Sequence, residues 1–299
     1  MAKTSEPHVK SACLRVLVQL TGNEACVLAL LGSGLMPKLL EELKNFEPEE
    51  DPKKKKNIYY EEEEVPPAED ELVMWLAVSR VCVAVSARKL DMSMNDRRCL
   101  ELILNKVCMP LASLDVLVQC SWCMAFLSLS PVSFLPIEAQ LKVLLEKSLH
   151  ETEFLLETCS TLMYNLTCQS SNTEMMLRSE YYLNIMIHMM RGGKEVVQSN
   201  VVEAMRNMCC HASAAKWLLQ KDILPDFVVI ALLRTNSETI KSTCCDAFYN
   251  LLCHEEPRAT FIGGDLWWGT MKVARSEVER IRVVSAKALF NLSCRPEYA

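Results

Sequence analysis

A short motif that recurs at a nearly constant spacing limits what this chain can fold into more than any other feature. Four segments align without gaps, each with an asparagine, Leu or Met directly after it and a cysteine three residues after it, at Asn165, Asn207, Asn250 and Asn291. Three weaker segments upstream carry Ser128, Ala84 and Gln19 at the asparagine position. The spacings along these seven positions are 65, 44, 37, 42, 43 and 41 residues. A period of this length is typical of proteins built from repeated helical units.

Each period contains helices separated by turn residues. In the unit that ends near Asn250, the sequence predicts three helices, over 213–220, 225–233 and 237–253. A turn over 221–225 separates the first two, and Pro225 lies in the first turn of the second. The next unit repeats this order over 257–262, 266–274 and 277–293. The chain has only 8 glycines, and nearly all fall at such junctions, so the composition also favours helices over strands.

The 65-residue interval is the exception, and it contains the stretch 47–70, which has a different composition. This stretch holds four prolines and two opposed charge blocks, Lys53–Lys56 and Glu61–Glu64, and it accounts for the whole net charge of −6. A segment of this composition cannot bury a core, so it is predicted to be an insertion loop in an otherwise regular array. The rest of the chain is neutral, which argues against a nucleic-acid partner.

Three helices in about 42 residues, with a third helix of the type Ala-Leu-x-Asn-Leu, resemble the armadillo repeat. The resemblance covers nearly the whole chain outside 47–70. It implies an all-α fold, a right-handed superhelical solenoid of about six three-helix repeats that spans residues 1–299. The third helices are expected to end near 20, 86, 130, 168, 210, 253 and 294. HEAT repeats are the second choice, because they have two helices and lack the asparagine.

The chain departs from the armadillo pattern at one position and at its two ends. Armadillo proteins that bind nuclear-import peptides carry tryptophan four residues before the asparagine. Here that position holds Arg15, Arg80, Met124, Thr161, Glu203, Asp246 and Lys287, so import-receptor function is not expected. Residues 7–20 resemble a third helix without its first two helices, and no polar terminal cap is evident. Either the ends dock onto other chains, or the chain is part of a longer solenoid.

The sequence offers little for catalysis or metal binding. It has no Gly-rich phosphate loop, no His-Glu-x-x-His and no nucleophile elbow, so we expect a protein that is not an enzyme and has no cofactor. Cys209, Cys210 and Cys253 lie beside histidines, but one cysteine per repeat cannot bring sulfur atoms within the ~4 Å that a shared zinc requires. The favoured interpretation is that these cysteines are small apolar core residues.

Cysteine usage and hydropathy predict a cellular compartment. The chain has 15 cysteines, its first dozen residues do not form a secretory signal, and no apolar run reaches the ~18 residues of a membrane span. The nearest run, Leu72 to Ala87, contains Arg80 and is expected to be a buried helix. These features predict a cytoplasmic protein with reduced thiols and no membrane insertion.

The asparagine column is the candidate protein-binding site. The resemblance implies that the third helices line the concave face, where an amide, as both donor and acceptor, can hold the backbone of an extended peptide. The residues proposed for this groove are Asn165, Asn207, Asn250, Asn291, Glu157, Glu203 and Asp246. The acidic members would favour a peptide rich in Lys or Arg. The alternative is that each asparagine only bridges neighbouring repeats.

Two functions therefore stay open on the sequence alone, both involving protein partners. The first is a structural subunit of a larger assembly, such as ciliary or axonemal, cytoskeletal or trafficking machinery. The second is an adaptor that binds an extended, basic peptide in the concave groove. The degenerate upstream positions Gln19, Ala84 and Ser128 leave only half of a groove, which favours the structural subunit.

Overall fold

The computed structural model describes residues 7–44, 69–88, 102, 114–129, 134, 138–214, 218, 235–254 and 265–293. Within these ranges every regular element is a helix and no strand occurs, which confirms the all-α prediction. The helices predicted over 225–233 and 257–262 lie outside the described residues. The insertion 47–70 lies outside them too, except for its last two residues, which begin a helix. The chain divides into two compact units, residues 1–132 with 136–147 and residues 133–135 with 148–299.

The first unit is centred on one long helix, α4 (Glu69–Arg88). It packs against α1 (Pro7–Thr21) and α6 (Leu114–Leu127), and also against α2 (Glu24–Gly32) and α3 (Leu35–Lys44). The Arg80 guanidinium donates to the carbonyl oxygen of Val18 at 2.6 Å and so ties α4 to α1. Trp75 and Val78 are buried, as expected for this helix. No described helix is long and apolar enough to cross a membrane.

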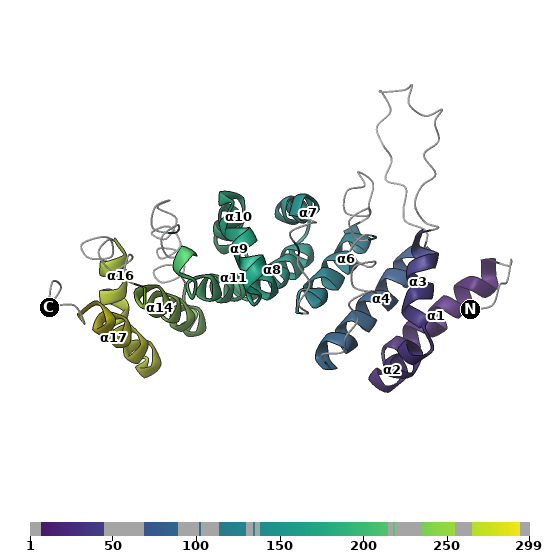
Figure 1. Cartoon of the computed structure of the whole chain (residues 1–299), viewed down its shortest axis with the longest axis horizontal. Helices are drawn as coiled ribbons and strands as arrows, with labels where there is room; N and C mark the ends of the chain where they lie inside the picture. Colours follow the sequence, from purple (N-terminus) through teal and green to yellow (C-terminus); the bar gives the residue numbers. More distant parts are fainter. Residues whose placement is uncertain are drawn as a thin grey trace, which may run out of the picture. The chain divides into compact units, whose positions relative to one another are not determined.

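The second unit contains a complete three-helix repeat, formed by α9 (Ser170–Leu177), α10 (Glu180–Gly192) and α11 (Glu195–Met208). Before it comes α8 (Glu153–Thr167), and after it come α14 (Glu238–Leu252), α16 (Asp265–Val273) and α17 (Glu279–Ser293). Another helix, α7 (Glu138–His150), spans the boundary between the two units in the sequence. The third helices α8, α11, α14 and α17 stack side by side in this order (Figure 1).

The ends of these helices follow from local sequence. The hydroxyl of Thr152 accepts a hydrogen bond from the backbone N–H of Leu155, and Glu153 places a negative charge in the first turn of α8. The Ser179 hydroxyl caps α10 in the same way. Gly34, between α2 and α3, has a φ of 73°, which side chains with a Cβ rarely adopt. Capping and turn residues therefore set the boundaries that periodicity predicted.

The core of the second unit is a stripe of apolar residues along each third helix. We number positions from the asparagine, which is position 0. Positions −10, −3 and +1 are buried in all four helices, and a spacing of seven and four residues keeps them on one face. They are Leu155, Leu162 and Leu166 in α8, Val197, Ala204 and Met208 in α11, Ile240, Ala247 and Leu251 in α14, and Ile281, Ala288 and Leu292 in α17.

The register of α6 differs from the one that the sequence suggested. Ser128 was assigned to position 0, but it follows the end of α6. The buried residues of α6 match those of α8 only when Phe126 takes that position. In this register the 2.9 Å hydrogen bond between Ser79 and Gln119 joins position −5 of one third helix to position −7 of the next. The bond between Ser160 and Asn200 joins the same two positions. We therefore place the register of α6 at Phe126.

Candidate functional site, a ladder of asparagine amides and cysteine thiols

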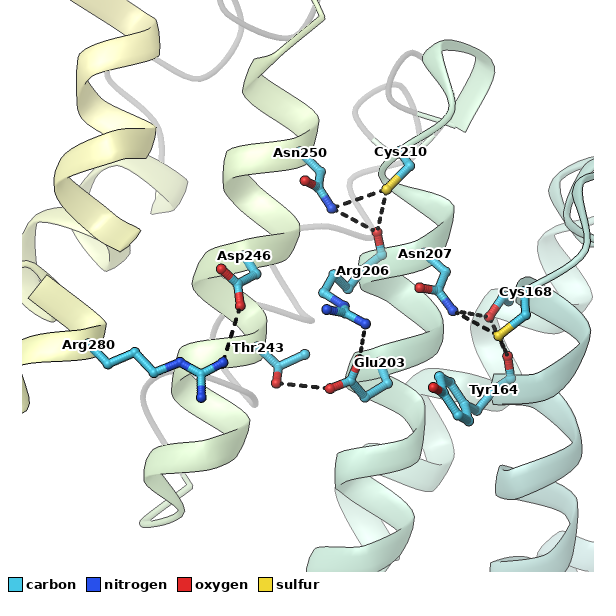
Figure 2. A network of polar contacts seen from close by, with 11 residues as sticks. Tyr164, Cys168, Glu203, Arg206, Asn207, Cys210, Thr243, Asp246, Asn250 and Arg280 are labelled. Atoms are coloured by element: carbon cyan, nitrogen blue, oxygen red, sulfur yellow. Dashed lines mark hydrogen bonds and ion pairs between the residues drawn. The ribbon is translucent and has the colours of Figure 1, made fainter. Parts of the chain in front are cut away.

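The asparagine and cysteine columns lie on the same side of each third helix, because positions 0 and +3 are about one helical turn apart. The contacts of α11 with α8, of α14 with α11 and of α17 with α14 are the most extensive in the second unit. This stacking brings position 0 of one helix beside position +3 of the helix before it (Figure 2).

Three of the four asparagine amides reach the cysteine of the preceding repeat. The amide nitrogen of Asn207 donates to the Thr167 hydroxyl at 3.2 Å and to the sulfur of Cys168 at 3.5 Å. The Asn250 nitrogen donates to the Cys210 sulfur at 3.1 Å and to the Arg206 carbonyl oxygen at 3.3 Å. The Asn291 nitrogen lies 3.5 Å from the Cys253 sulfur. We call these three links the asparagine–cysteine ladder.

The thiols in the ladder act as donors as well as acceptors. The Cys168 sulfur donates to the carbonyl oxygen of Tyr164 at 3.6 Å, and the Cys210 sulfur donates to that of Arg206 at 3.5 Å. Burial raises the pKa of Cys168 above its ordinary value, although Asn207 and Arg206 act in the opposite direction. The Cys168 thiol therefore stays protonated at neutral pH, and only a protonated thiol can both donate and accept.

The exposure of two ladder cysteines corrects the interpretation drawn from sequence. Cys210 and Cys253 were expected to be core residues, yet both are exposed, whereas Cys209 is buried as expected. Position +2 faces the interior of the unit, and position +3 follows the asparagine on the outer side. The spacing Asn-x-x-Cys, about one helical turn, places both side chains on one side of a helix, but the bond itself joins two repeats, so the spacing alone does not predict it. Among the described residues, no group of three or more His, Cys, Asp or Glu could hold a metal ion.

The acidic residues proposed for the groove already interact with neighbours in the chain. Glu203 forms an ion pair with Arg206 at 2.7 Å and accepts a hydrogen bond from the Thr243 hydroxyl at 3.3 Å. Asp246 lies 3.9 Å from the guanidinium of Arg280 on the next third helix (Figure 2). A basic ligand would therefore compete with arginines of this chain.

The remaining two predicted residues, Asn165 and Glu157, lie outside the ladder. Asn165 is only 5% exposed, whereas Asn207, Asn250 and Asn291 are half-buried. The backbone carbonyl of Glu157, itself half-buried, accepts hydrogen bonds from the Ser160 and Thr161 hydroxyls. A ligand on this surface would consequently meet three of the four asparagines.

Comparison with known proteins identifies the fold of this chain through solved structures. No protein-family model matches the sequence, and no curated protein matches it. Solved structures do match, among them the designed armadillo repeat protein YIII(Dq)4CqI, with a TM-score of 0.61 and 14% identity over 86% of this chain and 99% of that one.

A second designed armadillo repeat protein, solved in complex with the peptide (KR)4, has a TM-score of 0.64 and 13% identity over 86% of this chain and 99% of its own. An engineered protein has a TM-score of 0.73 and 13% identity over 97% of this chain and 66% of its own. The chain therefore has an armadillo-type repeat fold.

Proposed function

We propose that this chain is a non-enzymatic scaffold for protein interactions and a structural subunit of a larger assembly. The observation that carries the proposal is the ladder: the amide nitrogens of Asn207, Asn250 and Asn291 each donate to the preceding repeat. These groups hold the array together, so they are not preorganised for a ligand. Ciliary or axonemal, cytoskeletal and trafficking machineries in the cytoplasm are the kinds of assembly we infer.

A second candidate is an adaptor for an extended, basic peptide. In its favour, the amide oxygens of Asn207, Asn250 and Asn291 have no hydrogen-bond partner among the described residues, so each could accept from a peptide N–H. Glu203 and Asp246 add negative charge to the same side of the stacked helices (Figure 2). The designed armadillo protein crystallised with (KR)4 has the same type of fold.

A variant that removes two asparagines separates these functions. In Asn207→Ala with Asn250→Ala, the scaffold function predicts a lower melting temperature, because the ladder is lost. It also predicts that a labelled peptide of four Lys-Arg pairs binds the wild type no more tightly than about 1 mM, roughly −4 kcal/mol.

The adaptor function predicts micromolar or tighter binding of the same peptide by the wild-type chain. The double asparagine variant should then bind about 5–150-fold more weakly, as expected for a loss of about 1–3 kcal/mol. Glu203→Gln with Asp246→Asn should weaken binding further, and less so at high salt. Tight binding that depends on the asparagines would overturn the structural subunit as the main function.

A further inference from the structure

Each third helix inside the stack of the second unit has two distinct sides, one toward the following third helix and one toward the preceding one. Toward the following helix, α14 presents positions −8, −5 and +2, which are Ser242, Cys245 and Leu252, and all three are buried. The sulfur of Cys245 lies 3.5 Å from the Ser285 hydroxyl of α17. We call this side of a third helix its trailing face.

The opposite side meets the preceding helix, and we call it the leading face. In α14 it contains positions −7, −6, −3 and +1, and these four residues are buried: Thr243, Cys244, Ala247 and Leu251. The Thr243 hydroxyl donates to Glu203 of α11, which shows the direction in which this face points. Within the second unit, the leading faces of α11, α14 and α17 each pack against the third helix before them.

The trailing face of α17 is exposed. Its positions −8, −5 and +2 are Val283, Ala286 and Ser293, and Phe290 lies between them at position −1. Val283 is 45% exposed and Phe290 is 66% exposed. The equivalent residues of α14 are buried or half-buried, so α17 presents to solvent the surface that α14 buries.

The leading face of α1 is exposed as well. With Gln19 at position 0, this face consists of Ala12, Cys13, Val16 and Leu20, and all four are exposed. Val16 is 59% and Leu20 is 40% exposed, whereas Leu17 and Thr21, on another side of α1, are buried. One chain therefore exposes both halves of the contact that joins consecutive repeats.

We propose that copies of this chain associate head to tail, with the trailing face of α17 in one copy packed on the leading face of α1 in the next. The occupant follows from continuity with the stacking inside the second unit, where the trailing faces of α8, α11 and α14 each pack against the leading face of the next third helix. Ala286 and Ala12 leave room for close approach, and Val283, Phe290, Val16 and Leu20 supply apolar surface.

This association goes beyond the scaffold function, because its partner is the chain itself and the asparagine–cysteine ladder is not required for it. The two faces differ, so the contact is heterologous, and each dimer leaves one face of each kind open for another copy. Assembly should therefore continue to larger species as concentration rises.

Two variants and their mixture test the proposal by analytical ultracentrifugation of the whole chain. The first variant, Val283→Glu with Phe290→Glu, blocks the trailing face, and the second, Val16→Glu with Leu20→Glu, blocks the leading face. We expect the wild type to gain mass with concentration and each variant alone to stay monomeric. An equimolar mixture should form a dimer and nothing larger, because only one pair of intact faces is available.

Phe154→Glu is the matched control, because Phe154 is 76% exposed on α8 and belongs to neither face. It should assemble like the wild type. Circular dichroism checks that every variant is folded. If a double variant is unfolded, Phe290→Ser replaces the trailing-face variant and Val16→Ser replaces the leading-face variant. A wild type that stays monomeric at about 100 µM, where even weak contacts with a Kd near 100 µM are half-formed, overturns the proposal. So does a leading-face variant that still dimerises, or a mixture that does not.

Discussion

Replacing Asn250 by alanine should destabilise the second unit, and the structure sets the size of the effect. The amide nitrogen of Asn250 has two partners in the preceding repeat, the Cys210 sulfur at 3.1 Å and the Arg206 carbonyl at 3.3 Å. A hydrogen bond contributes a net ~0.5–1.5 kcal/mol, and the half-buried position of Asn250 favours the lower end of that range. The loss should be about 1–2 kcal/mol, or about 2–8 °C in melting temperature for a unit of this size.

The control for this prediction is Asn184→Ala, because Asn184 is an exposed asparagine inside α10. Both substitutions replace asparagine by a better helix former, which gains about 0.5 kcal/mol in each case. The control should therefore melt at the wild-type temperature or slightly above it. Thermal unfolding followed by far-ultraviolet circular dichroism measures the difference.

A double-mutant cycle then isolates the bond between amide and thiol. Cys210→Ala and Asn250→Ala, alone and together, should show a coupling free energy of about 0.5–1 kcal/mol. Once one substitution has removed the bond between amide and thiol, the other has no such bond left to remove, so the two effects do not add. A coupling energy of zero would refute the ladder as a stabilising element. Equal melting temperatures for Asn250→Ala and Asn184→Ala would refute it as well.

Three further predictions concern burial, a tight turn and an interhelix bond. Burial raises the pKa of Cys159 from 9.0 to about 12, so the thiol loses its proton more readily in the unfolded state than in the folded state. The unfolding free energy should therefore fall above about pH 9, by about 1.4 kcal/mol for this thiol at about pH 10, and Cys159→Ala should flatten that dependence. Gly193→Ala should cost about 1–3 kcal/mol, because a Cβ there would lie 2.6 Å from the Met189 carbonyl oxygen, whereas Gly192→Ala, with nothing within 4 Å, should not destabilise. Arg80→Met should lower the unfolding free energy by about 1–3 kcal/mol in chemical denaturation, because the part-buried carbonyl of Val18 on α1 loses its charged donor and keeps the Thr21 hydroxyl as a neutral one.

The sequence predicts the third helices well because their constraints are local. The helix predicted over 237–253 corresponds to α14 with Ser237 and Cys253 as its flanking residues, and the helix predicted over 277–293 begins two residues too early. Helix period, capping residues and the fixed asparagine all act within about four turns of one helix. Such signals can be read without knowing what packs against the helix.

The register of α6 shows where prediction from local sequence alone fails. Ser128 follows the small residue Ala125 by three, as the repeat pattern asks, yet burial places Phe126 at position 0. A shift of two residues turns a helix by about 200°, so the two assignments put opposite faces toward the core. A match of residue types cannot distinguish them when the asparagine itself is missing.

The role of the ladder cysteines was also beyond the sequence, for a different reason. Cysteine is usually a buried, apolar residue, and this prior is correct for Cys159, Cys209 and Cys244. It fails for Cys168 and Cys210, because their partner is an amide on another repeat about 40 residues away. Interactions between repeats depend on how the helices stack, which no local pattern contains.

The capacity of the ladder to accept another molecule rises along the second unit. Asn165 is almost fully buried, Asn207 and Asn250 each hold two partners in the preceding repeat, and Asn291 has a single contact of 3.5 Å among the described residues. A ligand at Asn250 must displace bonds that hold the repeats together, whereas one at Asn291 displaces the weakest of them. The same helix exposes Phe290 beside that asparagine. On α17 the ladder asparagine with the weakest contact thus lies beside an exposed aromatic side chain, so we expect a partner of the second unit to bind there.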